Sequence, residues 1–312
     1  MSVDALRSLD VIAGKPVLGI LLVTDSYEAI VTVLGHYRAQ GNPARLEIVI
    51  IGLNGIEMPA AAFERWSFPH LRILPSDSGD IGEAEGMAVR EATAPFVVFA
   101  QAGSYPKPGF VDAILRALES SQWAVVGPSI ESANPGTTLS WAALWILYGP
   151  WVDARARGGT VSVPGHNSAY NRRALLSLGD DLERFLDAGS QLQVELSARG
   201  NRCILEPEAR IEIVMPTRPG EFIGRLFQRG RQFAGQRSAF WSLARRLVYV
   251  AASPIIPLVR LRRIVALVVQ RGQGPAALPG FPALLLGLAA SATGEMFGYL
   301  FGVALSGCDQ ST

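Results

Sequence analysis

The sequence is poor in cysteine, with only Cys203 and Cys308 among its 312 residues. Two isolated cysteines form neither a disulfide framework nor a zinc-ligand pattern, which favours a reducing compartment. Residues 1–15 lack a basic segment followed by an apolar core, so we expect no secretory signal there. No excess of charge of either sign is present, because the formal net charge is only +1. This balance argues against a nucleic-acid-binding protein.

Charged residues are also scarce, at 18% of the chain. The mean hydropathy of +0.25 is high for a soluble enzyme, and the apolar excess lies mostly near the C-terminal end. A chain of this length can bury one large domain and still carry an appendage. We therefore expect two parts, a domain over residues 15–217 and a basic, apolar helical tail over residues 218–312.

Short apolar runs alternate with helical patterns through the first part. Residues 17–23 read as a strand that is apolar on both faces, as in a parallel sheet covered by helices on each side, and residues 46–51 read as the next strand. Further strands are expected near residues 71–74, 96–100 and 123–126, with helices over about residues 30–37 and 81–92 and after Pro108. This alternation predicts an α/β domain with a mostly parallel sheet.

A small polar turn follows the strand at residues 96–100 and reads Gln101-Ala102-Gly103-Ser104. Because open α/β sheets bind ligands at the carboxyl ends of their strands, a site is expected at this turn. The sequence then continues with a Pro-x-Pro-Gly pattern and a helix. This order of strand, turn, prolines and helix resembles the metal-binding turn of family 2 glycosyltransferases, which are inverting nucleotide-sugar enzymes with the GT-A fold.

The resemblance extends over about residues 15–215. LEIVIIGLNG matches the family's second strand, GHNSAYNRRALLSLG from Gly165 matches its Gly-x-Asn-x-x-x-Arg-Arg segment, and LQVELSARGNRCILEPEARI from Leu192 matches its helix, turn and strand. The resemblance implies a nucleotide-sugar pocket. Its donor-side candidates are Thr24, Asp25, Asn54, Gln101, Gly103 and Ser104, and its acceptor or diphosphate candidates are His166, Asn167, Gln228, Arg229 and Arg231.

The functional acids of that family are missing here. Gly52 and Leu53 stand in place of the Asp that binds the nucleotide base, and Glu85 and Gly86 stand in place of an Arg-Asn pair. The Asp-x-Asp motif is replaced by Gln101, Ala102 and Gly103. Ala188 and Gly189 stand where the family has its catalytic base. A departing diphosphate needs a cation to neutralise its charge, and neutral oxygens make a poor Mg²⁺ site. We therefore expect no metal and no cofactor. Asp187 is a weak candidate for the base.

Several of these residues have structural interpretations that stay open. Asp25 and Ser26 fit helix caps better than ligands, and Asp180, Asp181 and Glu183 fit a solvated loop. His166 and Asn167 fit a hydrogen-bonded turn as well as a pocket wall. The basic segment at residues 228–232 fits a diphosphate clamp or a helix face near a membrane. The aromatic segment at residues 138–152 fits an acceptor site, a partner site or a core.

The tail interleaves arginines with apolar residues, which is typical of helices lying in a membrane interface. Residues 247–259 are broken by prolines and read as an interfacial piece. Residues 281–305 are long enough to span a bilayer but contain Glu295, so a span and a helix packed on other helices both stay open. Gly294, Gly298 and Gly302 recur every four residues and predict a close helix-packing face.

The absent acids favour a catalytically degenerate glycosyltransferase homologue. It would act as a scaffold or partner in cell-surface glycan assembly at the cytoplasmic face of the membrane, with a protein partner or a second copy. The alternative is an active, metal-independent glycosyltransferase that acts on a lipid-linked or glycan acceptor, with Arg229 and Arg231 on the diphosphate and Asp187 as base. Nucleotide sugar and the membrane surface are the expected partners, and nucleic acid is not.

Overall fold

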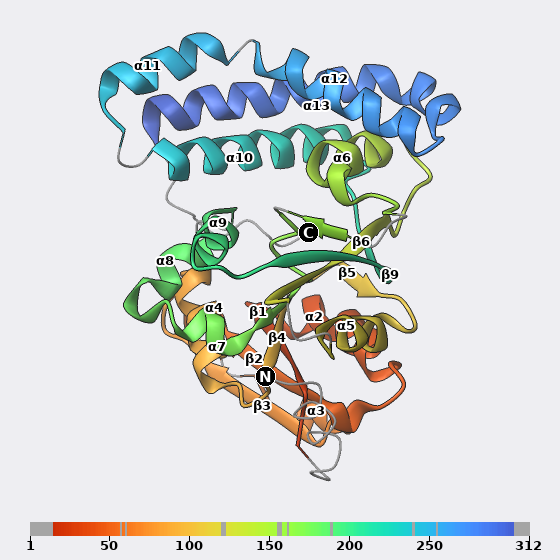
Figure 1. The fold of residues 1–312 in the computed structure, drawn as a ribbon, viewed down its shortest axis with the longest axis vertical. Helices are drawn as coiled ribbons and strands as arrows, with labels where there is room; N and C mark the ends of the chain where they lie inside the picture. The colour runs from red at the N-terminus through yellow and green to blue at the C-terminus, as the bar shows by residue number, and fades with distance from the viewer. Residues whose placement is uncertain are drawn as a thin grey trace. The chain divides into compact units, whose positions relative to one another are not determined.

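The computed structural model describes residues 15–302, apart from residues 57, 60, 120–122, 155–157, 161, 188–189, 239–240 and 254. The side chains of residues 158–160, 187, 190 and 275–277 are also outside the description, as are Cys308 and residues 303–305 of the apolar segment. The chain forms two compact units (Figure 1). The first unit holds the residues up to Ile130 and Asp153–Ile213, and the second holds Glu131–Val152 and the chain from Val214 onward. The second unit therefore includes a segment that the sequence analysis placed within the first domain.

A single mixed sheet of nine strands, counted over the described residues, organises the first unit. The strand order is β3-β2-β1-β4-β8-β6-β9-β5, and β7 pairs with β9. The strands are β1 (Leu18–Thr24), β2 (Leu46–Gly52), β3 (His70–Pro75), β4 (Phe96–Ala100), β5 (Ser104–Pro106), β6 (Val125–Ser132), β7 (Gly158–Thr160), β8 (Ala169–Asn171) and β9 (Cys203–Ile213). The first four are parallel, and β8 runs antiparallel to β4. The expected α/β domain with its early parallel strands is confirmed.

Helices flank this sheet in the first unit. They are α2 (Tyr27–Arg38), α3 (Ala61–Glu64), α4 (Ile81–Glu91), α5 (Phe110–Glu119), α7 (Arg172–Leu176), α8 (Leu182–Asp187) and α9 (Ser190–Ala198), with single 3₁₀ turns at Pro43–Arg45, Leu53–Gly55 and Gly179–Asp181. Strands β1, β2 and β4 are buried on both faces apart from a partly exposed Val23. Helix α2 begins at a cap made by Ser26, whose hydroxyl accepts a hydrogen bond from the Ala29 amide. The capping interpretation is confirmed for Ser26.

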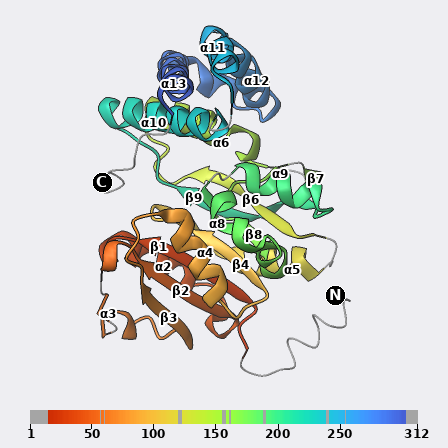
Figure 2. The same ribbon diagram turned by 90° about the vertical axis from the view of Figure 1, so that its left-hand side faces the viewer.

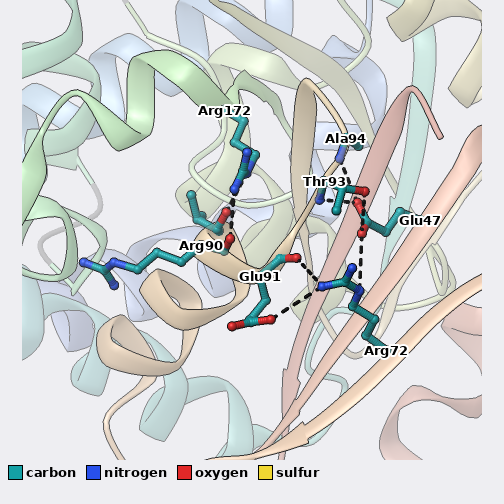
Figure 3. Close-up of polar contacts among 8 residues, drawn as sticks. Glu47, Arg72, Arg90, Glu91, Thr93, Ala94 and Arg172 are labelled. Carbon is teal, nitrogen blue, oxygen red and sulfur yellow. Dashed lines mark hydrogen bonds and ion pairs between the residues drawn. The ribbon is translucent and has the colours of Figure 1, made fainter. Parts of the chain in front are cut away.

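A buried carboxylate fixes the connection between α4 and β4, and Figure 3 shows its contacts. Glu47 on β2 is 2% exposed and accepts hydrogen bonds from the amides of Thr93 and Ala94, at 2.7 and 2.8 Å, and from the Thr93 hydroxyl, at 3.0 Å. The Arg72 guanidinium lies 3.9 Å from the same carboxylate. Arg172 donates to two carbonyls near the end of α4. These contacts hold the amino end of β4, which is the opposite end from the expected site.

The second unit consists of helices, which are α6 (Thr138–Tyr148), α10 (Pro219–Ser238), α11 (Leu243–Ala252), α12 (Ile256–Gln270) and α13 (Gly274–Phe301), with a 3₁₀ turn at Gly149–Trp151. Helix α13 lies alongside α10, with α11 and α12 also against it (Figures 1 and 2). Trp145 and its aliphatic neighbours on α6 are buried. The aromatic segment at residues 138–152 therefore contributes largely to the core of this unit.

Glycines allow α10 and α13 to approach closely. A Cβ added at Gly294 would lie 2.0 Å from the Phe227 carbonyl oxygen, and one added at Gly298 would lie 2.4 Å from the Arg231 carbonyl oxygen. The predicted packing face is therefore confirmed for these two glycines. It is wrong for Gly302, which follows the helix at a φ of 76° and has no atom within 4 Å of its added Cβ. Gly302 ends the helix at a positive φ, which suits glycine.

A buried carboxylate in the apolar stretch of α13 forms an ion pair with α12. Nη1 of Arg260 on α12 lies 3.0 Å from Oε1 of Glu295 and also donates to the Ser291 hydroxyl at 2.9 Å. Among the helices of the described part, only Leu278–Phe301 is long and apolar enough to cross a bilayer, and half of it is buried inside the unit. Length and composition of this kind are shared by spans and by core helices, so both interpretations of this segment stay predictions.

Candidate functional site

Parallel register places the carboxyl ends of β1, β2 and β4 at one edge of the sheet. Thr24 lies opposite Gly52, and Leu22 lies opposite Ala100, the last residue of β4. The turn that follows β4 has Gly103 at a φ of 72° and is closed by a hydrogen bond from the Ser104 amide to the Gln101 carbonyl, 3.1 Å. The first strand and the candidate turn thus meet at the edge where the sequence analysis expected a site.

The candidates that follow β1 and β2 are engaged in local structure. The Thr24 hydroxyl donates to the Ser26 carbonyl at 2.8 Å and accepts from the Ser26 amide at 3.1 Å. Asp25 is exposed beside it. Asn54 adopts a left-handed φ of 56°, and its amide donates to the Ser78 carbonyl. Thr24 and Asn54 therefore shape the turns at this edge, and Asp25 has an exposed carboxylate there.

An acid–imidazole pair that the sequence did not predict lies at the same edge. Glu85 on α4 is 7% exposed, and its Oε1 lies 3.0 Å from Nε2 of His166, whose side chain is 40% exposed. The loop with His166 is held beside β4 because the Asn167 amide donates to the Phe99 carbonyl at 2.7 Å. Helix α4 and the loop before β8 therefore build this pair together.

The chemistry of the pair follows from which nitrogen faces the acid. A carboxylate accepts hydrogen bonds, so Glu85 favours the tautomer of His166 with its proton on Nε2. The Nδ1 lone pair then has no partner among the residues that the structure describes. A carboxylate that orients an imidazole whose other nitrogen is free is an arrangement suited to accepting a proton. Glu85 is thus held by His166 and is not a free carboxylate facing a phosphate.

Two other polar side chains near the turn are buried without a partner. Asn167 is 2% exposed at a φ of 64°, and its Oδ1 has no hydrogen bond within the described structure. The hydroxyl of Ser104, which is 1% exposed, is likewise unpartnered there. An unmade hydrogen bond of this kind costs about 1–3 kcal/mol. The backbone amide of Asn167 is thus hydrogen-bonded, as expected for a turn residue, whereas its side-chain Oδ1 is not.

The turn after β4 does not fit a divalent cation. Hard cations prefer several carboxylate oxygens, yet the turn offers the Gln101 amide, backbone groups and the Ser104 hydroxyl. No group of three or more His, Cys, Asp or Glu side chains capable of holding a metal exists among the described residues. Glu85, the nearby buried acid, is bound to His166.

The acids around α8 have structural partners. Glu183 forms an ion pair with Arg90 of α4, and that hydrogen bond lowers the pKa of Glu183. Its side chain also packs where a Cβ on Gly86 would lie, 2.9 Å from the Glu183 Cγ. Asp181 pairs with Arg184 at 3.1 Å. The solvated-loop expectation thus misses the contact between Glu183 and α4.

The remaining candidates are not joined to this edge by the structure. Asp187 ends α8, but its side chain lies outside the described residues, together with Ala188 and Gly189, so its role as base stays a prediction. Gln228, Arg229 and Arg231 belong to α10 in the second unit. Gln228 and Arg229 are exposed, and Arg231 is half-buried. Their role on a diphosphate also stays a prediction.

Similarity to known structures identifies the fold of the chain. No family model and no curated protein matches the chain. Among solved structures, the mannosyltransferase PcManGT from Pyrobaculum calidifontis, in complex with GDP-Man and Mn²⁺, is similar with a TM-score of 0.56 and 16% identity over 91% of this chain and 88% of that one. The 1–349 fragment of S. aureus TarS in complex with UDP is similar with a TM-score of 0.51 and 14% identity, over 89% of this chain and 90% of that one. The chain has the GT-A glycosyltransferase fold.

Proposed function

We propose that this chain is a glycosyltransferase-like protein that retains a nucleotide-sugar pocket but has lost metal-assisted transfer. In this proposal it serves as a scaffold or partner in cell-surface glycan assembly. The observation that carries the proposal is the neutral turn after β4, where Gln101, Ala102 and Gly103 provide no carboxylate. The similar structures solved with GDP-Man and with UDP support a nucleotide-linked ligand for this chain.

The physical argument concerns the leaving group. A nucleoside diphosphate gains negative charge as the sugar departs, and a metal ion or a fixed cation has to stabilise that charge. The turn supplies neither a metal-binding carboxylate nor a cationic side chain. A pocket of this kind can still hold a nucleotide sugar through its backbone groups and side-chain amides. We therefore expect binding without efficient transfer.

Titration calorimetry with UDP-GlcNAc, GDP-Man and UDP, each with and without Mn²⁺, tests this proposal. The expected result is nucleotide binding that Mn²⁺ does not strengthen, with no turnover in a matched transfer assay. The double variant Gln101→Asp/Gly103→Asp restores the Asp-x-Asp pattern and is expected to gain Mn²⁺-dependent binding. Position 103 tolerates Asp better than most residues because Asp adopts a positive φ more readily. Mn²⁺-dependent binding or turnover by the wild-type protein would contradict the proposal.

One observation favours a second candidate, an active transferase that needs no metal. The pair of Glu85 and His166 provides a proton acceptor at the carboxyl edge of the sheet. In this candidate, Nδ1 of His166 takes the proton of the acceptor hydroxyl as that oxygen bonds to the anomeric carbon. The bond from that carbon to the donor phosphate oxygen breaks, and the nucleoside diphosphate leaves with the bonding electrons.

The second candidate is tested by metal-free turnover. A positioned base contributes roughly 10²–10⁴-fold to a rate, so His166→Gln is expected to lose activity on that scale. Glu85→Gln is expected to show a smaller loss, because Glu85 acts through His166. The variant Asp187→Asn is the comparison, since Asp187 is the alternative base. Absence of metal-free turnover in the wild-type protein removes this candidate, and loss only in Asp187→Asn reassigns the base.

We also propose that the protein works at the cytoplasmic face of the membrane, held there by its second unit. The apolar composition of Leu278–Phe301 supports an association of this kind. A protein partner or a second copy of the chain completes the scaffold proposal. Liposome flotation of the full chain tests the membrane association, and failure to float with any vesicle would contradict it.

A further inference from the structure

A long segment of the second unit carries charge of only one sign. Residues 222–294 contain no Asp, Glu or Lys, and their ten charged residues are Arg225, Arg229, Arg231, Arg237, Arg245, Arg246, Arg260, Arg262, Arg263 and Arg271. The next acid along the chain, Glu295, is buried and paired with Arg260. The surface that this segment presents is therefore positive wherever it is charged.

Helix α12 is unusual because its outward side is apolar. Leu258 and Val269 are 66% and 65% exposed, whereas Ile264 and Val268 face the interior. Spacings of three, four and seven residues place exposed side chains on one side of a helix. Arg262 and Arg263 are exposed among these aliphatic residues. The outer side of α12 thus combines large apolar side chains with two cations.

Helix α11 continues the pattern. It buries none of its residues, and Leu243, Leu247 and Val248 are 71%, 50% and 64% exposed. At its start, the Arg245 guanidinium lies 4.1 Å from the ring centroid of Trp241. Tryptophan, arginine and exposed aliphatic side chains gather in this way where helices meet the headgroup region of a bilayer. Helices α11 and α12 follow one another along α13, on the side of it away from α10 (Figure 1).

We propose that the exposed sides of α11 and α12 bind the surface of a bilayer that contains anionic phospholipids. This α11–α12 face is defined by Leu247, Val248, Leu258, Arg262, Arg263 and Val269. Its aliphatic side chains enter the boundary between headgroups and acyl chains, and its arginines contact lipid phosphates. The helices lie in the plane of the membrane and do not cross it. The proposal does not depend on the nucleotide-sugar pocket.

Charge decides between a lipid surface and a second copy of the chain. In a symmetric dimer through this face, Arg262 and Arg263 would meet the arginines of the same face, and no acid of residues 222–294 could neutralise them. Anionic lipid headgroups provide the missing negative charge. The apolar side chains alone fit either a bilayer or a second copy, so the arginines decide in favour of the bilayer.

The contacts of α13 support a peripheral arrangement. Its glycines pack directly on the α10 backbone, and Glu295 is held by Arg260 of α12. Crossing a bilayer as a lone helix would separate both contacts and carry Glu295 into hydrocarbon, which is unfavourable. An association through α11 and α12 leaves these contacts intact.

Co-sedimentation of the full chain with vesicles tests the proposal. One set of vesicles contains phosphatidylcholine alone, and the other contains phosphatidylcholine mixed with phosphatidylglycerol. We expect binding to the mixed vesicles that weakens with added salt, and little binding to the neutral ones. An arginine near an anionic surface strengthens binding about fivefold, so Arg262→Glu/Arg263→Glu should weaken it by at least about 25-fold.

Matched variants separate the face from general effects. Arg38→Glu/Arg184→Glu makes the same change in net charge at exposed positions of the first unit and should retain binding. Leu258→Ser/Val269→Ser keeps every charge and should weaken binding through the lost apolar contact. Thermal unfolding of each variant verifies that it folds. Because these side chains are exposed, and the ion pair of Arg184 with Asp181 that the control removes is worth at most about 1 kcal/mol, we expect only small shifts in the midpoints.

Four results would overturn the proposal. Two concern the vesicles, namely equal binding to both kinds and no binding to the mixed vesicles at low salt. The third is a loss of binding in the first-unit control as large as in Arg262→Glu/Arg263→Glu. The fourth is a loss of binding in Leu285→Ser/Phe297→Ser on α13 without a loss in the α11–α12 variants. A concentration-dependent dimer that the Arg262→Glu/Arg263→Glu variant abolishes, without lipid binding by the wild-type protein, would assign the face to a second copy instead.

Discussion

Nε2 of His166 lies 3.0 Å from Oε1 of Glu85, although 81 residues separate the two along the chain. Helix α4 brings the carboxylate, and the loop that precedes β8 brings the imidazole. Their contact lies at the carboxyl edge of the sheet, where open α/β sheets bind ligands. A buried carboxylate against one ring nitrogen sets the proton on that nitrogen and leaves the other as an acceptor.

We expect His166 to be an Nε2-protonated tautomer in its neutral form. The variant Glu85→Ala removes the acceptor for that proton, so the ring is expected to become a mixture of tautomers and to lose its fixed orientation. Nitrogen chemical shifts of the three histidines, assigned with His166→Gln, measure this. The shifts of His36 and His70 serve as the control and should stay constant. An Nδ1-protonated ring in the wild-type protein, or no change in Glu85→Ala, would show that the contact does not orient the ring.

The carboxylate of Glu47 is expected to contribute strongly to stability. Glu47→Ala leaves the buried amides of Thr93 and Ala94 without an acceptor, and hydrogen bonds to a charged group contribute about 1.5–3 kcal/mol each. We expect a loss of about 3 kcal/mol or more in the free energy of unfolding, measured by urea denaturation. Glu91→Ala is the control, because its ion pair with Arg72 is exposed and worth at most about 1 kcal/mol. Similar losses in the two variants would contradict this account.

The sequence predicts the sheet well because its signals there are local. Residues 17–23 and 96–100 are apolar runs, residues 46–51 are apolar apart from Glu47, and the structure places a strand at each. The position of the turn at Gln101 follows from the strand before it. Order of strands and register then bring Thr24, Gly52 and the end of β4 to one edge, as expected for a parallel sheet.

Side-chain partners across the fold were not predictable in this way. Glu85 and His166 belong to separate segments, and neither segment contains a local pattern that indicates the other. The ion pair between Glu183 and Arg90 likewise joins two segments that are far apart along the chain. In the second unit, the glycine spacing at Gly294 predicted the packing face, but the spacing alone did not identify α10 as the neighbour. Periodicity shows which side of a helix is packed and does not show against what.

The stability of the second unit is expected to depend on pH through Glu295. Burial raises the pKa of Glu295 above its ordinary value of 4.5, and the charges of Arg260 and Arg237 offset part of the rise. The folded protein therefore holds this proton more tightly than the unfolded chain does. The contribution of Glu295 to stability is most favourable below about pH 4.5 and declines as the pH rises through the raised pKa.

Glu295→Gln tests this dependence, because Gln carries no charge at any pH. As the pH rises from about 4.5, the variant is expected to gain in free energy of unfolding relative to the wild-type protein. Urea unfolding at several pH values, followed by tryptophan fluorescence, measures the difference. A difference that stays constant with pH, or that moves in favour of the wild-type protein, would show that Arg260 fully compensates the burial of Glu295.

The close approach of α10 and α13 leads to a further prediction at Gly294. A Cβ there would lie 2.0 Å from the Phe227 carbonyl oxygen, so Gly294→Ala forces the two helices apart. Overpacking of this kind costs about 1–3 kcal/mol, and we expect a loss on that scale in urea unfolding. Gly224→Ala is the matched control on α10, since nothing lies within 4 Å of its added Cβ. Alanine favours a helix over glycine by about 1 kcal/mol, so the control should be stabilised. A gain in stability for both variants would mean that the two helices are not packed backbone to backbone.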